Sequence, residues 1–216
     1  MEILNKINKK ILFLTIFTIA FQSLCYLIGK LGLERSVLLD PKIDQIIPFI
    51  SPFIFAYIAW YPLLIILPMV IYYYDKKSYY YYFSSVIITS ILGITLFLII
   101  PITITRYTGE LSGISSSFVK LIYFIDTPTS CLPSFHAAIC FIWIFLSLKS
   151  KKMPTLFKVL VIVISILIIL STLFIKQHIL LDVIAAFFVV LIAYNLSILF
   201  KLDKKVEFLL NYLETI

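Results

Sequence analysis

The sequence predicts an all-α protein, a six-span transmembrane helical bundle with a short interfacial helix in the outer loop before the fourth span. Three observations predict this class. The chain of 216 residues is 62% hydrophobic. Only 13% of its residues are charged, whereas soluble domains carry about 25%. The apolar residues fall in long runs separated by short lysine clusters. Because no part has the composition of a soluble module, residues 1–216 are expected to form one integral membrane domain.

Six apolar segments supply the predicted spans, since a helix needs about 20 apolar residues to cross the hydrocarbon core. These segments cover residues 11–29, 48–72, 80–104, 133–148, 155–175 and 179–200. The first follows a lysine cluster that ends at Lys10 and therefore resembles a signal peptide. Its length and the lack of an A-x-A site after it instead predict a retained span. The fourth segment is the shortest.

The distribution of positive charge predicts the orientation in the membrane. Of the 18 Lys and Arg residues, 12 lie on the side that holds both termini, Lys6 among them, and six lie on the other side. Since cytoplasmic loops carry the excess of Lys and Arg, both termini are expected in the cytoplasm. The loops at residues 30–47, 105–132 and 176–178 then face outward. The small size of the chain and its lack of targeting extensions favour a bacterial cell membrane.

Two segments outside the spans have amphipathic patterns. In the stretch 112–125, apolar residues recur at helical spacing, which predicts a short helix in the outer interface. These residues are Ile114, Phe118, Leu121, Ile122 and Ile125. The C-terminal tail repeats the pattern and predicts a cytoplasmic surface helix. Its apolar residues are Val206, Leu209, Leu210 and Leu213. The tyrosine-rich run at residues 72–82 is expected to form an interfacial aromatic belt around a tight turn.

Charge and cysteine content exclude two classes of partner. The net charge of +7 resides in the clusters that flank the spans, so no nucleic-acid partner is expected. Cys25, Cys131 and Cys140 form an odd set without metal-ligand spacing, and they predict neither a metal site nor a cofactor.

One polar pair interrupts the sixth span. An aspartate near the centre of a membrane helix costs about 2.5–3.5 kcal/mol, and less near an interface. Asp182 follows His178 by four residues, so both project from one helix face. A carboxylate that accepts the N–H of an imidazole fixes its tautomer and makes the other ring nitrogen a better nucleophile or base. The alternative is a structural polar pair that links helices.

The second histidine favours a catalytic site over a structural polar pair. His136 opens the fourth span after Pro133 and Ser134, and a proline suits a first helical turn. In the alternating topology the fourth and sixth spans both begin at the outer face. His136 and His178, which are the only two histidines, are therefore expected at the same depth.

Cations near the same face predict a phosphate group as the ligand. Arg106 ends the third span, and its planar guanidinium suits phosphate oxygens. Lys176 adds an ammonium two residues before His178. The helix N-terminus at Ser134 adds backbone N–H donors. Two histidines and an aspartate could instead hold zinc, but the adjacent positive charges would repel a metal ion.

These residues resemble the motifs of the type 2 phosphatidic acid phosphatase superfamily. Residues 131–136, with the order Cys-Leu-Pro-Ser-Phe-His, resemble its P-S-G-H motif. Residues 171–182 resemble its S-R-x5-H-x3-D motif, and the spacing from Ser171 to His178 and Asp182 fits without gaps. Arg106 fits the arginine of the K-x6-R-P motif. The six-span plan fits too, so the resemblance covers nearly the whole chain.

The chain departs from these motifs at four positions. In the K-x6-R-P motif, Ile99 stands in place of the lysine and Tyr107 in place of the proline. Phe135 replaces the glycine of the P-S-G-H motif, and Thr172 replaces the arginine of the S-R-x5-H-x3-D motif. Two phosphate-binding cations of the family pattern are thus replaced, and Lys176 is expected to restore one of them.

The resemblance implies a metal-independent lipid phosphatase of the outer membrane face that acts through a phosphohistidine. In that scheme His178 is the nucleophile, Asp182 orients it, and His136 protonates the leaving oxygen and then activates the acceptor. Arg106, Ser134 and Lys176 bind the phosphate oxygens, and Ser171 belongs to the substrate site through its motif position. The expected substrate is a phospholipid or a prenyl phosphate or diphosphate.

Two other functions stay open. The substituted motifs also resemble the branch with sphingolipid head-group transferases, which pass a phospho-head-group to an alcohol. A non-enzymatic transporter would use Asp182 as a relay or substrate ligand. The polar residues gather at one end of the spans, and no inverted repeat is apparent, which disfavours a transporter.

Overall fold

The computed structural model describes residues 9–212 and is almost entirely helical. Its α-helices are α1 (Lys9–Gly29), α2 (Lys42–Ile46), α3 (Ile54–Tyr74), α4 (Lys76–Ile99), α5 (Ile114–Ile125), α6 (Phe135–Lys149), α7 (Thr155–Phe174), α8 (Leu180–Leu199) and α9 (Leu202–Tyr212). Short 3-10 helices cover Lys30–Arg35 and Ser51–Phe53, and two strands, β1 (Val37–Leu39) and β2 (Ile102–Ile104), form a parallel ribbon. Lys6 and Leu213 lie outside the described residues.

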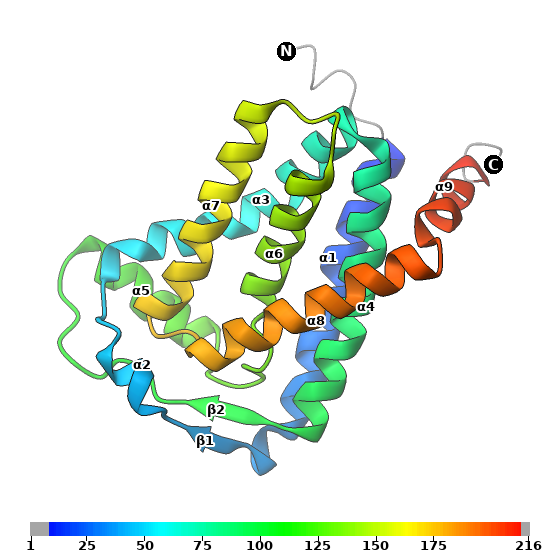
Figure 1. Ribbon diagram of the computed structural model, residues 1–216. Helices are drawn as coiled ribbons and strands as arrows, with labels where there is room; N and C mark the ends of the chain where they lie inside the picture. Colours follow the sequence, from blue (N-terminus) through cyan, green and yellow to red (C-terminus); the bar gives the residue numbers. More distant parts are fainter. Residues whose placement is uncertain (1–8, 213–216) are drawn as a thin grey trace.

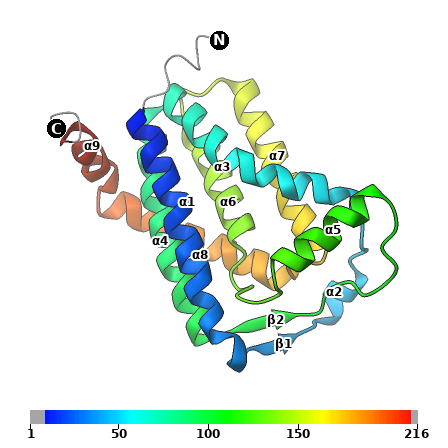
Figure 2. The same ribbon diagram turned by 180° about the vertical axis from the view of Figure 1, so that it is seen from behind.

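The long helices form a bundle with α6 at its centre (Figures 1 and 2). Helix α6 packs against α4, α7 and α8, while α1 packs along α4 and α3 crosses α7. The β1–β2 ribbon lies across one end of the bundle, which we call the ribbon end. Helix α9 and the start of α1 lie toward the opposite end, the termini end (Figure 1). The ends of the described chain therefore share one side of the bundle.

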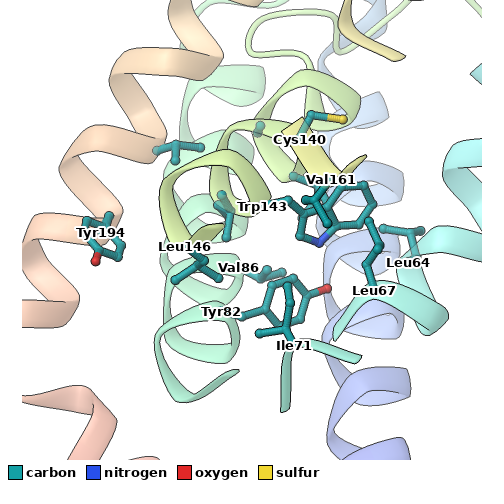
Figure 3. Close-up of a cluster of buried hydrophobic side chains, with 14 of the residues drawn as sticks. Leu64, Leu67, Ile71, Tyr82, Val86, Cys140, Trp143, Leu146, Val161 and Tyr194 are labelled. Atoms are coloured by element: carbon teal, nitrogen blue, oxygen red, sulfur yellow. The ribbon is translucent and has the colours of Figure 1, made fainter. Parts of the chain in front are cut away.

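The core is built around the side chains of α6. Trp143 and Leu146 pack with Tyr82 and Val86 of α4 and with Ile71 of α3 (Figure 3). Tyr79, also on α4, is fully buried, and its hydroxyl donates to the carbonyl of Ile11 at 3.1 Å. The predicted aromatic belt at residues 72–82 is therefore corrected in part: Tyr79, Tyr80 and Tyr82 belong to the core, because the adjacent helices α1 and α3 cover this face of α4.

Within residues 9–212, five helical segments are long and apolar enough to cross a membrane. They are Lys9–Gly32, Ser51–Tyr74, Lys76–Ile99, Thr155–Phe174 and Leu180–Leu199. The predicted fourth span, α6, has only 15 residues, or about 22 Å at 1.5 Å per residue, against about 30 Å of hydrocarbon. Its apolar character has a second cause, since most of its residues are buried against other helices.

The predicted third span, residues 80–104, wrongly includes a strand at its end. Helix α4 ends at Ile99, and Ile102–Ile104 form β2, which pairs in parallel with Val37–Leu39. Pro101 breaks the helix because it has no N–H to donate and disfavours helical geometry in the preceding residue. The second span is also later than predicted, since α3 starts at Ile54 after a 3-10 turn.

The two predicted amphipathic segments are helices. In α5, the apolar residues expected on one face are mostly exposed, whereas Val119 and Ile122 pack on the protein. An exposed apolar face is what an interfacial helix requires. In α9, Val206 and Leu210 are buried, and the helix packs against α4.

Candidate active site

A tight turn between α7 and α8 places His178 at the ribbon end. Lys176 has a φ of 53°, which reverses the chain directly after α7. The backbone N–H groups of Gln177 and His178 both donate to the carbonyl of Thr172, at 2.9 and 3.0 Å. The turn thereby completes the C-terminus of α7 and fixes His178 just before α8 begins.

His178 and Asp182 form a buried pair. The His178 Nδ1 lies 3.0 Å from the Asp182 Oδ2, and the same oxygen accepts the backbone N–H of Ile179 at 3.1 Å. The carboxylate thus lies in the first turn of α8, where the helix dipole favours negative charge. Asp182 is fully buried and does not line the cavity described below, whereas His178 does. The Nδ1 tautomer that donates to Asp182 leaves the lone pair of Nε2 free for attack.

His136 lies in the first turn of α6, opposite this pair. The Ser134 hydroxyl caps the helix by accepting the Ala137 N–H at 3.3 Å. The Ser134 N–H donates to the Asp182 carbonyl at 3.2 Å and so links the start of α6 to α8. The His136 ring packs between Tyr57 and Trp60, with centroid distances of 4.4 and 4.1 Å. Its centroid lies 6.0 Å from that of His178.

Arg106 follows β2 and is held in a fixed position. Its Nη1 donates to the Tyr123 carbonyl at 3.0 Å, and its Nη2 donates to the Gln177 Oε1. The guanidinium also lies 4.4 Å from the centroid of the Tyr123 ring. These contacts orient the planar group before any ligand binds.

A cavity of about 330 Å³ joins these residues. His136, His178, Arg106 and Gln177 all line it, together with residues from α1, α3, α4 and the loop before α6. Aromatic rings form much of the remaining wall: Tyr26, Trp60, Tyr61, Phe97 and Phe135. A largely apolar pocket with a few convergent polar groups is the usual form of a small-molecule site.

The cavity wall carries buried nitrogens that lack a hydrogen-bond partner among the described residues. They are the Nε2 atoms of Gln22, His136 and Gln177, the Nε of Arg106 and the Nε1 of Trp60. Leaving a buried polar group unpaired costs about 1–3 kcal/mol. A ligand rich in acceptor oxygens, such as a phosphate ester, would pair with the N–H groups among these atoms.

Three residues expected to bind substrate do not line the cavity. Ser134 uses its hydroxyl as a helix cap, and the Ser171 hydroxyl donates to the Ile168 carbonyl at 2.6 Å. The Lys176 Nζ donates to the carbonyls of Asp44 and Ile47, at 2.7 and 2.5 Å. Partial burial lowers the pKa of this ammonium, although Asp44 and Asp40 oppose the shift. The described contacts give Lys176 a structural role in holding α2 against the turn before α8.

Two of the four departures from the family motifs have local explanations. Phe135 packs over Gly93 of α4, where a Cβ would lie only 2.3 Å from the phenylalanine ring. Gly93 therefore makes room for the ring that replaces the motif glycine. Tyr107, in place of the motif proline, stacks on Phe49 with a centroid distance of 4.0 Å. This contact ties the end of the β2 loop to the segment before α3.

One group of residues in the described part of the chain could hold a metal ion. Potential ligand atoms of Cys131, His178 and Asp182 all lie within 4.8 Å of one another. His136, which the sequence grouped with His178 and Asp182 as possible zinc ligands, is not among them. The bond between His178 Nδ1 and Asp182 Oδ2 already uses one atom of each residue. Burial and the nearby Asp182 charge raise the pKa of the Cys131 thiol well above its ordinary value, which disfavours the thiolate form.

Sequence reasoning missed several polar residues of the cavity, among them Gln22, Lys30, Asp126 and Gln177. Gln22 and Lys30 come from α1 and the 3-10 turn after it, far in sequence from every motif. The spacing of Gln22, Tyr26 and Lys30, at i, i+4 and i+8 in an apolar span, is the signal that could have revealed them.

Comparison with known protein families gives a match over most of the chain. The family model described as the PAP2 superfamily matches residues 22–196, which include every residue of the site described above. No curated protein and no solved structure matches the chain.

Proposed function

The chain belongs to the PAP2 superfamily, and on this premise we propose that it is a membrane lipid phosphatase that works through a phosphohistidine on His178. The family and the five apolar helices indicate a phosphatase-type membrane protein. The observation that carries the finer proposal is the arrangement of the two histidines. Both line one cavity, but only His178 has a carboxylate on its Nδ1.

The distance between the rings suits a phosphoryl group between them. A near-attack contact needs about 3–3.5 Å between the reacting atoms, and a general acid needs about 2.6–3.2 Å to the oxygen that it protonates. Ring centroids 6.0 Å apart leave room for one phosphoryl group that meets both. Arg106 stands on the same cavity and offers its unpaired Nε to a non-bridging oxygen.

In the proposed first step, His178 Nε2 donates its lone pair to phosphorus as the phosphorus–oxygen ester bond breaks. The bonding electrons leave with the lipid oxygen, which takes a proton from His136 in its protonated form. The His178 Nδ1 proton stays in its hydrogen bond with Asp182, whose charge stabilises the phosphorylated ring. In the second step His136 takes a proton from water, the hydroxide oxygen attacks phosphorus, and the nitrogen–phosphorus bond breaks to release phosphate.

A lipid substrate is proposed from the rim of the cavity. Leu27 of α1 and Ile125 of α5 both line the cavity, yet they are 60% and 63% exposed. Exposed apolar side chains beside a polar centre suit a ligand with an anionic head and an apolar chain. The exposed apolar face of α5 continues this surface.

The proposed orientation puts the ribbon end, and with it the cavity, outside the cell. The excess of lysine near the termini end supports this choice through the positive-inside rule. Labelling of single introduced cysteines at Lys42 and Lys151 by a membrane-impermeant maleimide in intact cells tests it. Position 42 is expected to react and position 151 to stay protected; the reverse result would contradict the orientation.

The direct test of function is a substrate panel. Purified full-length protein in detergent receives phosphatidic acid, phosphatidylglycerol phosphate and a prenyl diphosphate, with EDTA present, and free phosphate is measured. Release from at least one lipid, its loss in His178→Ala and its persistence in Lys120→Gln are expected. Full activity in His178→Ala would contradict the mechanism. Activity that EDTA removes and zinc restores would contradict metal independence.

A head-group phosphotransferase is the second candidate, and Asp126 is the observation that favours it. This carboxylate lines the same cavity, where it accepts the Tyr26 hydroxyl. A carboxylate beside the reacting phosphorus could also accept the proton of an alcohol. Product analysis with an added lipid alcohol separates the two reactions, since transfer yields a new phospholipid in place of free phosphate.

A further inference from the structure

Helix α1 contributes a polar wall to the cavity. Gln22 and Tyr26, with Lys30 at the start of the following 3-10 turn, all line it. Residues spaced by four share one helix face, so this wall is a continuous strip. Other polar groups of the cavity come from the segment after β2, the loop between α5 and α6, the start of α6 and the turn before α8.

Gln22 brings a buried donor to this wall. The residue is only 5% exposed, and its Nε2 has no hydrogen-bond partner among the described residues. A glutamine so deep in an apolar span costs free energy unless its amide is paired. Since Gln22 lines the cavity, a ligand oxygen can provide the missing acceptor.

Lys30 brings a positive charge. Its Nζ lies 4.8 Å from the centroid of the Tyr26 ring, and no ion pair is present for it within residues 9–212. Tyr26 in turn donates its hydroxyl to Asp126. The ring therefore holds the half-buried ammonium by a cation–π contact and is itself held in place by the carboxylate. This arrangement leaves the three N–H donors of Lys30 for a ligand.

We propose that this α1 wall is an oxygen-binding subsite, in which Lys30 and Gln22 hold the non-reacting phosphate oxygens of the substrate. The assignment of a lipid phosphate as that substrate rests on the proposed function. The subsite itself rests on the cavity, the unpaired amide and the ammonium. It replaces Lys176, which is bound to backbone carbonyls, as the second cation of the site.

A simpler role for Lys30 is to reach the membrane surface, where lysines near helix ends place their charge. The two roles differ in one measurable property. A surface lysine contributes nothing to the binding of a phosphate ion in the cavity. A subsite lysine contributes strongly, and so does the buried Gln22 beside it.

The test is equilibrium binding of radioactive inorganic phosphate to the full-length protein in detergent. We expect Lys30→Gln to weaken binding about tenfold, while Lys30→Arg, which keeps the charge, stays within about threefold of wild type. Gln22→Glu has nearly the same volume but adds a negative charge, so it should weaken binding at least tenfold. Lys120→Gln removes an exposed lysine of α5 and should have no effect. Thermal melting verifies that each variant is folded.

Three results would overturn the subsite: wild-type affinity in folded Lys30→Gln, wild-type affinity in folded Gln22→Glu, or no phosphate binding to the wild type. The failure of the proposed function gives a different pattern, because binding is measured without turnover. A protein that hydrolyses none of the lipids but still binds phosphate through Lys30 and Gln22 retains the subsite and loses the phosphatase assignment. If the wild type hydrolyses a lipid phosphate but Lys30→Gln and Gln22→Glu bind phosphate as tightly as the wild type, the phosphatase assignment stands and the subsite is lost.

Discussion

Asp75 at the termini end of the bundle and Asp182 at the ribbon end are both buried, and they differ in how fully they are hydrogen-bonded. At the termini end, Asp75 caps α4 and accepts the hydroxyls of Ser78 and Ser150, at 2.9 and 2.6 Å. At the ribbon end, Asp182 Oδ2 accepts hydrogen bonds from the His178 ring and the Ile179 N–H, while its Oδ1 has no hydrogen-bond partner within residues 9–212.

The residues around Asp75 and Asp182 differ in the same way in their hydrogen bonding. The Asp75 cluster joins the α3–α4 turn to the α6–α7 turn, and Lys158 adds a bond to the Ser150 carbonyl. Several residues that line the cavity near Asp182 have buried nitrogens without a hydrogen-bond partner in the described part of the chain. Unpaired buried groups reduce stability, and a ligand bound in the cavity would pair with some of them. The comparison suggests that the termini end serves folding and the ribbon end serves binding and chemistry.

The largest expected effect is at the ribbon end. Replacing His178 by alanine removes the proposed nucleophile, and lipid phosphate hydrolysis should fall by at least about 10³-fold. The melting temperature should change by only a few degrees, because His178 contributes little to the core. Steady-state kinetics and thermal melting on the same preparation measure both effects. A variant that unfolds would mean that the pair is structural.

Asp182→Asn should have the next largest effect. Asparagine can still accept the Ile179 N–H, but it cannot stabilise a positively charged His178 and can favour the wrong tautomer. A loss in kcat of about 10²–10⁴-fold is expected, with a smaller change in KM. A change confined to KM would show that Asp182 does not act through the nucleophile.

Asp75→Asn should show the opposite pattern. The loss of charge-assisted hydrogen bonds should lower the free energy of unfolding by about 1–3 kcal/mol, while kcat of the folded enzyme stays within about twofold. Chemical denaturation and kinetics test this pair of results. A kcat effect comparable to that of Asp182→Asn would remove the distinction between the two ends.

The pH dependence of this stability difference is the smallest predicted effect. Burial alone would raise the pKa of Asp75, but hydrogen bonds from Ser150 and Ser78 outweigh it and hold the pKa below its ordinary value. A lowered folded-state pKa adds stability above the unfolded pKa, and this is lost as pH falls through the folded value. The difference in melting temperature between wild type and Asp75→Asn should therefore be constant from pH 7 to pH 5 and narrow below about pH 4. A difference in melting temperature that grows as the pH falls would contradict the hydrogen bonds assigned to Asp75.

The sequence predicted the long helices well, because the length of an apolar run sets them directly. The prediction failed where the structure of a segment depends on pairing with residues far away in the sequence. Residues 102–104 read as the end of a span, but they pair with residues 37–39, which lie more than 60 positions earlier. The short helix α6 is apolar as a core element, and composition alone does not separate a core helix from a lipid-facing one.

For the site, the four-residue spacing of His178 and Asp182 was informative, although His178 lies in the turn before α8 and not on the predicted helix face. Spacing across helices was not informative. The i, i+4 relation of His178 and Asp182 predicted their contact. The direction of Lys176 could not be predicted, since its positive φ turns the side chain toward the carbonyls of residues 44 and 47. The role of α1 depends on how that helix packs against α4 and α3, and no motif marks it.

The most direct test of the central claim is to trap the phosphorylated enzyme. Wild type and Asp75→Asn are mixed for milliseconds with a lipid phosphate that carries radioactive phosphorus, quenched in alkali and digested. The account predicts a label that is stable in alkali and lost in acid, located on the peptide that contains His178 and absent from His178→Ala. A label on any other residue, or turnover with an undiminished label in His178→Ala, would contradict the account.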